Sequence, residues 1–106
     1  MKIAIAADHR GAELKEKLMK NLIEEGHEIL DCSPQNHDTD DYPDFALKVA
    51  LKVANEELNF GVLICGSGIG MSIVANKIRG IRCARAVDLN DAIYSRKDNN
   101  ANVIAF

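Results

Sequence analysis

The stretch between Ile64 and Gly70 combines a thiol with closely spaced glycines, and both features can serve chemistry. Cys65 ends an apolar run, and Gly66, Gly68 and Gly70 follow it at alternate positions. Glycines leave backbone N–H groups accessible, and N–H groups at the start of a helix attract an anion or a developing oxyanion. The same positive helix end favours a thiolate, so Cys65 is a candidate base or nucleophile. A cysteine at a strand end can equally be a small packing residue, and the residues alone leave both interpretations open.

The glycine spacing fits the known nucleotide-binding motifs poorly. A dinucleotide fingerprint requires G-x-G-x-x-G, whereas Met71 occupies the third glycine position here. Asp88 follows the next predicted strand, where such a site has its ribose partner, so a nucleotide-binding module is retained as a weaker alternative. A Walker loop requires Gly-Lys-Ser/Thr, and because the chain has Gly-Met-Ser, that type of site is excluded.

Polar residues also follow other apolar runs. Asp8 and His9 come directly after the first run, where they could bind a hydroxyl or phosphate group or merely cap the next helix. Tyr42 comes just before a predicted helix and could reach a ligand or pack on the surface. We count all three among the candidate substrate contacts.

The other two cysteines give no sign of a reactive or metal-binding site. Cys32 and Cys83 lie in strand patterns, which favours packing, and Cys32 and His37 lack any recognised ligand spacing, so no metal site is predicted. Three cysteines are an odd number without paired spacing, which indicates reduced thiols and a cytoplasmic protein.

Apolar runs alternate with amphipathic stretches along the whole chain. The sequence predicts strands at 2–7, 27–32, 60–65, 82–87 and 102–106, and helices at 12–25, from 43, at 69–77 and from 88 or 90. This alternation predicts a single α/β domain over residues 1–106, with a doubly wound, Rossmann-like, five-stranded parallel sheet between two helical layers. Ligands of such sheets bind at the carboxyl ends of the strands. We expect Asp8, His9, residues 65–70, Asp88 and Asp98 on that side.

Composition excludes several classes of partner. The chain has 106 residues, of which 47% are hydrophobic and 27% charged, with a net charge of −3, as in one ordinary globular domain. The basic residues are scattered without interleaved aromatic residues, which argues against nucleic acid. No apolar run approaches the length of a membrane span, so no membrane partner is expected.

Four segments carry a resemblance to a known family. They are MKIAIAADHRG at 1–11, DYPDFA at 41–46, GVLICGSGIGMSIVANKIRGIR at 61–82 and NNANVIAF at 99–106. Together they resemble the type B ribose-5-phosphate isomerases and the related galactose-6-phosphate isomerase subunits. The resemblance implies aldose–ketose isomerisation of a sugar phosphate through a cis-enediolate, without metal or cofactor. Ribose 5-phosphate is the substrate that it favours.

The resemblance also implies roles for individual residues. Cys65 would remove the proton from C2 of the open-chain aldose. The backbone N–H groups of Gly66, Ser67, Gly68, Ile69 and Gly70 would hold the enediolate, with the Ser67 hydroxyl in place of the usual threonine. Asp8, His9 and Asn99 match residues that contact the sugar or its phosphate.

Two departures from the family pattern affect the expected activity. Asp98 stands where the family commonly has a histidine that opens the sugar ring as an acid, and a carboxyl group donates a proton only where its surroundings favour the neutral form. Relatives also continue beyond this point with helices of the dimer interface and phosphate-binding arginines. Arg10, Arg82, Arg85 and Arg96 are the candidate replacements. A weakly active or inactive sugar-phosphate-binding subunit of a two-component isomerase is therefore the alternative to an independent enzyme.

We expect a homodimer or a dimer of dimers. The last predicted strand, 102–106, is apolar and has no following helix to cover it. In the resembled family, moreover, the sites are built between subunits.

Overall fold

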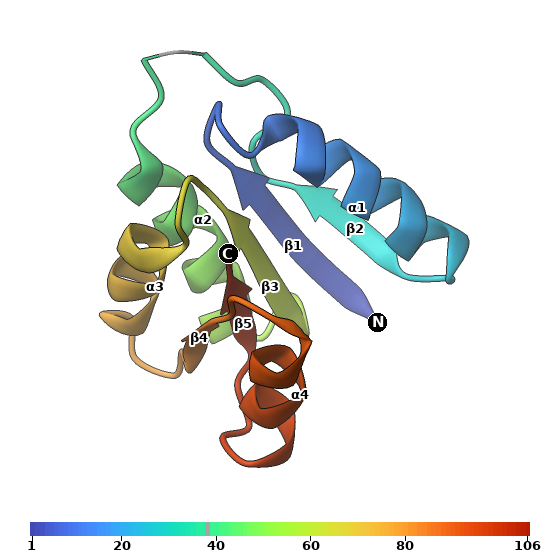
Figure 1. Cartoon of the computed structure of the whole chain (residues 1–106), viewed down its shortest axis with the longest axis vertical. Helices are drawn as coiled ribbons and strands as arrows, with labels where there is room; N and C mark the ends of the chain where they lie inside the picture. The colour runs from blue at the N-terminus through green and yellow to red at the C-terminus, as the bar shows by residue number, and fades with distance from the viewer. Residues whose placement is uncertain (38) are drawn as a thin grey trace.

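The computed structural model describes residues 1–37 and 39–106, so Asp38, in the predicted polar loop 33–41, lies outside the described residues. Strands and helices alternate along the chain as predicted (Figure 1). In order, the elements are β1 (Lys2–Ala7), α1 (Ala12–Glu24), β2 (Glu28–Asp31), α2 (Tyr42–Ala54), β3 (Phe60–Ile64), α3 (Ile69–Asn76), β4 (Cys83–Arg85), α4 (Leu89–Lys97) and β5 (Val103–Ala105). The strands other than β1 are one to three residues shorter than predicted. The runs read as strands in the sequence extend past the last backbone hydrogen bonds between neighbouring strands.

The five strands form one parallel sheet in the order β2-β1-β3-β5-β4. The doubly wound α/β prediction is therefore confirmed. β5 pairs with β3 on one side and with β4 on the other, so the last strand of the sequence is internal to the sheet. Sequence alternation does not determine this order, since each strand could have joined either edge.

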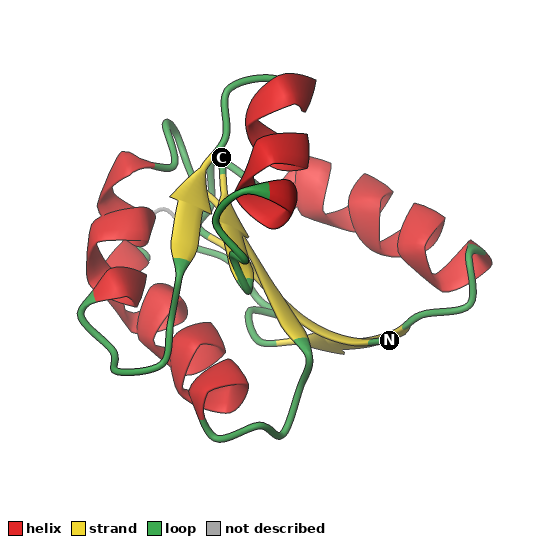
Figure 2. Cartoon of the chain, turned by 90° about the horizontal axis from the view of Figure 1, so that it is seen from below, coloured by secondary structure: helices red, strands yellow, loops and turns green. Residues whose placement is uncertain are grey.

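Helices cover both faces of the sheet (Figure 2). Alternate residues of β1 point to opposite sides: Ala4 and Ala6 join the core beneath α2 and α3, whereas Ile3 and Ile5 join the core beneath α1. Gly61 of β3 lets α2 approach the sheet closely, because a Cβ there would lie 2.6 Å from a methyl carbon of Val49. Among the described residues, no helix combines the length and apolar character that a membrane crossing requires.

The expectation that the last strand lacks cover is correct for one face only. Val103 and Ala105 are buried against the α2–α3 layer. Ile104 and Phe106 face the other layer, where they are half-buried in a groove of about 350 Å³ between α1 and α4. The uncovered apolar area is thus a strip between two helices.

The carboxyl ends of β1 and β3 meet at the point where the direction of winding changes. From β1 the chain passes to β2 on one side, and β3 then returns to the other side of β1. Ligands of doubly wound sheets bind in the crevice at such a switch point. The Asp8 N–H donates to the Ile64 carbonyl at 3.1 Å, which ties the two strand ends together. The turn after β1 and the loop after β3 therefore begin side by side, at the top of Figure 1.

Candidate active site

Cys65 is the first residue after β3, and its thiol lies within the glycine loop. The residue is half-buried and packs at the margin of the core beneath α2 and α3. Its backbone N–H donates to the Phe106 carbonyl at 3.0 Å, and its Sγ accepts the Gly68 N–H at 3.1 Å. The sulfur is therefore in direct contact with one of the loop N–H groups. The structure thus brings together the thiol and the N–H groups that the sequence had placed in one short segment.

Gly68 is the residue on which the loop depends most. It caps α3 in the left-handed conformation, with φ of +78°, which costs little only for glycine. A Cβ at this position would lie 2.7 Å from the Phe106 Cα, which is backbone. The loop therefore crosses the end of β5 at a distance that only glycine permits.

Ser67 is exposed, and its polar atoms are used at two places. Its Oγ accepts the Ile69 N–H at 3.2 Å, so the hydroxyl is turned toward the start of α3. Its carbonyl accepts the Arg85 Nε–H at 2.9 Å, which fastens the loop to the end of β4. These two contacts fix Ser67, within the predicted oxyanion segment 66–70, to the start of α3 and to the end of β4.

Asp8 is 2% exposed, and its carboxylate is occupied within its own turn. Oδ1 accepts the N–H groups of Arg10 at 2.9 Å and Gly11 at 3.2 Å. Oδ2 accepts the Arg10 Nε–H and Nη2–H at 3.3 and 3.2 Å. Asp8 thus holds the turn before α1, a role that differs from the two left open by the sequence, a substrate contact and a helix cap. His9, beside it, is exposed at the same strand end.

Arg10 and Tyr42 fill the space that two loop glycines leave free. A Cβ at Gly66 would lie 2.5 Å from the Arg10 Nη1, and a Cβ at Gly70 would lie 2.5 Å from the Tyr42 Cζ. The sequence interpretation assigned these glycines to close approach by a ligand, whereas within the chain they make room for side chains from the turn after β1 and from α2. Tyr42 thus lies next to the loop, a contact that the sequence did not predict. Arg10 was only one of four candidate arginines, and its sole sequence signal is that it follows Asp8 and His9.

Asp98 and Asn99 lie at the amino ends of the strands, whereas Cys65 lies at their carboxyl ends. The prediction that Asp98 lies on the carboxyl side is therefore wrong for a single chain. Asp98 is the last-turn cap of α4, and the Asn99 carbonyl accepts the Arg82 Nε–H at 2.7 Å just before β4 begins. A helix that connects parallel strands begins at their carboxyl edge and ends at their amino edge. The lower end of α4 in Figure 1 therefore points away from the Cys65 loop.

Asp88 does lie at the carboxyl side, but its side chain caps α4. The carboxylate accepts the Asp91 N–H at 2.8 Å. A capping carboxylate is engaged with the backbone rather than offered to a ribose hydroxyl. This contact weakens the nucleotide-binding alternative.

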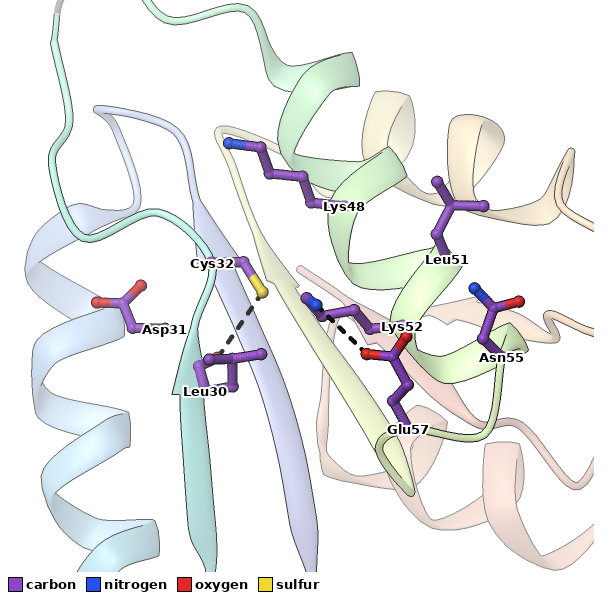
Figure 3. Close-up of a pocket in the computed structure, with 8 residues that line it drawn as sticks. All are labelled: Leu30, Asp31, Cys32, Lys48, Leu51, Lys52, Asn55 and Glu57. Carbon is purple, nitrogen blue, oxygen red and sulfur yellow. Dashed lines mark hydrogen bonds and ion pairs between the residues drawn. The ribbon is translucent and has the colours of Figure 1, made fainter.

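A second cleft, of about 360 Å³, lies at the sheet edge between β2 and α2 (Figure 3). Cys32 points into it, and Lys52 pairs with Glu57 at 3.4 Å across its lower end. Burial raises the pKa of the Cys32 thiol, and burial also raises the pKa of the Cys83 thiol, to about 12. Both thiols therefore stay protonated near neutral pH, which leaves Cys65 as the best candidate base among the three. Within residues 1–37 and 39–106 there is also no cluster of three side chains suited to a metal ion.

Comparisons with known proteins agree with this arrangement. A family described as Ribose/Galactose Isomerase matches residues 3–106. The chain is 44% identical over 105 residues to the ribose-5-phosphate isomerase B of Escherichia coli K12, which covers 99% of this chain and 70% of that protein. Against the ribose-5-phosphate isomerase B of Mycobacterium tuberculosis H37Rv, identity is 39%, covering 98% of this chain and 65% of that protein.

The chain is also similar in structure to solved ribose-5-phosphate isomerases of type B. Clostridium thermocellum ribose-5-phosphate isomerase B has a TM-score of 0.96 at 43% identity, covering 100% of this chain and 72% of that chain. A Mycoplasma genitalium ribose-5-phosphate isomerase B with bound ribulose-5-phosphate has a TM-score of 0.93 at 40% identity, covering 98% of this chain and 70% of that chain. The similarity thus includes every element that positions the Cys65 loop.

Proposed function

The chain belongs to the ribose/galactose isomerase family, whose relatives are sugar-phosphate isomerases, and we propose that it interconverts ribose 5-phosphate and ribulose 5-phosphate with Cys65 as the base. The observation that carries this proposal is the 3.1 Å contact between the Cys65 sulfur and the Gly68 N–H at the switch point of the sheet. The choice of substrate is supported by the names of the relatives and by the bound ribulose-5-phosphate in the Mycoplasma genitalium structure.

The proposed reaction needs one base and a site for a negative oxygen. The Cys65 thiolate removes the proton from C2 of the open-chain aldose, and the C–H electrons form the C1–C2 double bond as the carbonyl electrons move onto O1. Backbone N–H groups of residues 66–70 stabilise the resulting enediolate. The O2 proton moves to O1, the Cys65 thiol returns its proton to C1, and the product is the ketose with a regenerated thiolate. The steps consume no redox equivalent, and they are proposed to need neither metal nor cofactor.

A coupled assay for ribulose 5-phosphate tests the proposal. Wild-type protein is expected to turn over ribose 5-phosphate, and Cys65→Ala is expected to lose at least ~100-fold in kcat, since a positioned base contributes about that much. Cys83→Ala is the matched control, because its thiol is protonated and lies away from the loop. Equal turnover by the wild type and Cys65→Ala would exclude the mechanism.

We also propose a homodimer or a dimer of dimers, in which Asp98 and Asn99 of one copy lie beside Cys65 of the other. Both residues lie at the amino edge of their own sheet, so they can complete the site only from a second copy. Asp98 would then open the sugar ring as the acid. Mixing inactive Cys65→Ala and Asn99→Ala proteins should restore about a quarter of wild-type activity, because half of the dimers are hybrids with one intact site. A fully active monomer in light scattering would contradict the shared site.

The alternative is a sugar-phosphate-binding subunit of a two-component isomerase. Asp98 in place of a ring-opening histidine favours it, since a carboxyl group near neutral pH is ordinarily ionised. Calorimetric binding of ribose 5-phosphate without turnover would support this alternative. Recovery of rate in Asp98→His would instead support the independent enzyme.

A cytoplasmic location is proposed as well. Cys32, Cys65 and Cys83 are free thiols in the fold, as expected of a protein in a reducing compartment. Detection of the native protein in a periplasmic or secreted fraction would contradict this location.

A further inference from the structure

The guanidinium group of Arg10 rests on the Cys65 loop and is held there from two sides. On one side, its Nη1 occupies the space that the absent Gly66 side chain leaves, 2.5 Å from where a Cβ would stand. On the other side, the buried Asp8 carboxylate accepts its Nε–H and Nη2–H. The Arg10 side chain is nevertheless 58% exposed. A cation is therefore fixed in position beside the candidate base and faces solvent.

Arg10 keeps donors for a ligand after these contacts. A guanidinium has five N–H groups, and Asp8 accepts only two of them. The remaining hydrogens include both on Nη1, the nitrogen nearest the loop. A planar guanidinium with two such donors matches the oxygens of a phosphate group, and its orientation by Asp8 lowers the entropy lost on binding.

The position of Arg10 relative to Cys65 determines which end of a substrate it meets. Cys65 follows β3, and the N–H groups that would hold the enediolate continue from it toward α3. Arg10 approaches Gly66 from the β1 side, which is the switch-point crevice. If C1 and C2 lie over the N–H groups, as in the proposed function, the rest of the sugar would extend into this crevice.

Another arginine also contacts the loop, but from the other side. Arg85 donates its Nε–H to the Ser67 carbonyl from the end of β4, which lies beyond β5 and away from the crevice. This contact fastens the loop, whereas the Arg10 contact leaves the loop carbonyls untouched.

We propose that Arg10 binds the phosphate group of the substrate and that Asp8 is the positioning residue that orients it. This inference rests on the proposed function, since it assigns the phosphate end of the same substrate. Asp8 then acts through Arg10 rather than by touching the sugar.

Calorimetric titration with ribose 5-phosphate tests the proposal on Cys65→Ala protein, in which turnover is absent. Adding Arg10→Gln should weaken binding about 10- to 100-fold, the range for losing hydrogen bonds to a charged group. Arg10→Lys keeps the positive charge but loses the planar set of donors. Its affinity for ribose 5-phosphate should therefore lie between that of Cys65→Ala alone and that of Cys65→Ala with Arg10→Gln. Arg79→Gln is the matched control, because Arg79 is an exposed arginine in the turn before β4, at the opposite edge of the sheet. It should leave affinity unchanged.

Inorganic phosphate provides a readout that a merely structural role would not alter. It should compete with ribose 5-phosphate for Cys65→Ala, and this competition should disappear with Arg10→Gln and weaken with Asp8→Asn. Unchanged affinity and competition in Arg10→Gln would overturn the proposal. So would an Arg85→Gln protein that alone loses phosphate competition.

The two proposals fail separately. If wild-type protein turns over ribose 5-phosphate and Arg10→Gln keeps its KM, the phosphate assignment is wrong and the isomerase function stands. If Arg10 governs binding but the wild type shows no turnover, the isomerase function is wrong and the phosphate assignment stands.

Discussion

Replacement of Gly68 by alanine separates two costs that the structure assigns to this position. The first is conformational: φ of +78° places a Cβ in a disfavoured region, at about 1–2 kcal/mol for a non-glycine residue. The second is steric, since the Cβ would lie 2.7 Å from the Phe106 Cα and 2.8 Å from the Phe106 nitrogen. The Phe106 backbone, just after β5, is hydrogen-bonded to Leu63 and Cys65 and cannot move aside as a flexible side chain can, so overpacking adds a further ~1–3 kcal/mol.

Gly80 provides the matched control. Its φ is +91°, and nothing lies within 4 Å of a Cβ built on it, so Gly80→Ala carries the conformational cost without the clash. In urea unfolding, Gly68→Ala should therefore lose about 2–5 kcal/mol and Gly80→Ala about 1–2 kcal/mol. In thermal unfolding, each kcal/mol should lower Tm by about 4–8 °C for a domain of this size.

The isomerase activity of Gly68→Ala and Gly80→Ala provides a second measurement. A shift of the Gly68 N–H away from the Cys65 sulfur removes the hydrogen bond to the proposed base, so kcat should fall more than tenfold in Gly68→Ala. Gly80→Ala should keep wild-type kcat. Equal stability losses in the two variants, or full activity in Gly68→Ala, would refute the reasoning.

Three further predictions concern the surroundings of the site. Gly66→Ala should cost about 1 kcal/mol, the low end for overpacking, since the atoms nearest the Cβ form the exposed far end of the Arg10 side chain. The displaced guanidinium should raise KM for ribose 5-phosphate as Arg10→Gln does, and an unchanged KM would contradict the contact. Iodoacetamide at pH 8 should alkylate Cys65 well before Cys83, because burial raises the Cys83 pKa to about 12 and keeps its thiol protonated. Peptide mass spectrometry would give the order of alkylation, and earlier alkylation of Cys83 would contradict the prediction. Lys15→Met should cost about 2–4 kcal/mol in urea unfolding, because the buried ammonium bonds the Ser33 carbonyl at 2.6 Å and leaves polar partners unpaired when removed; a neutral result would contradict this.

Much of the fold could be predicted because its signals are local. The alternation of apolar runs and amphipathic stretches is enough for five parallel strands and four helices, and the glycine run after β3 marks the loop. Strand order could not be predicted, since pairing β5 between β3 and β4 depends on contacts far apart in the sequence. The placement of Asp98 was within reach, because the end of a connecting helix in a parallel sheet must lie at the amino edge.

The candidate site could be predicted in part for the same reason. Cys65 and the N–H groups lie within a few residues of each other, so their association follows from the loop alone. The packing of Arg10 on Gly66 and of Tyr42 on Gly70 joins segments over fifty and nearly thirty residues apart. No local pattern reports such contacts, and glycines selected for a neighbouring side chain look the same in sequence as glycines selected for a ligand.

Exchange of substrate hydrogen with solvent tests most directly whether the Cys65 thiol moves the proton. Ribose 5-phosphate would be incubated in ²H₂O with wild-type protein and with Cys65→Ala, and carbon-bound deuterium would be followed by NMR. The wild type should introduce deuterium at C1 of ribulose 5-phosphate and at C2 of ribose 5-phosphate, and Cys65→Ala should introduce none above the uncatalysed rate. Deuterium uptake at the same rate in both proteins would show that another group is the base.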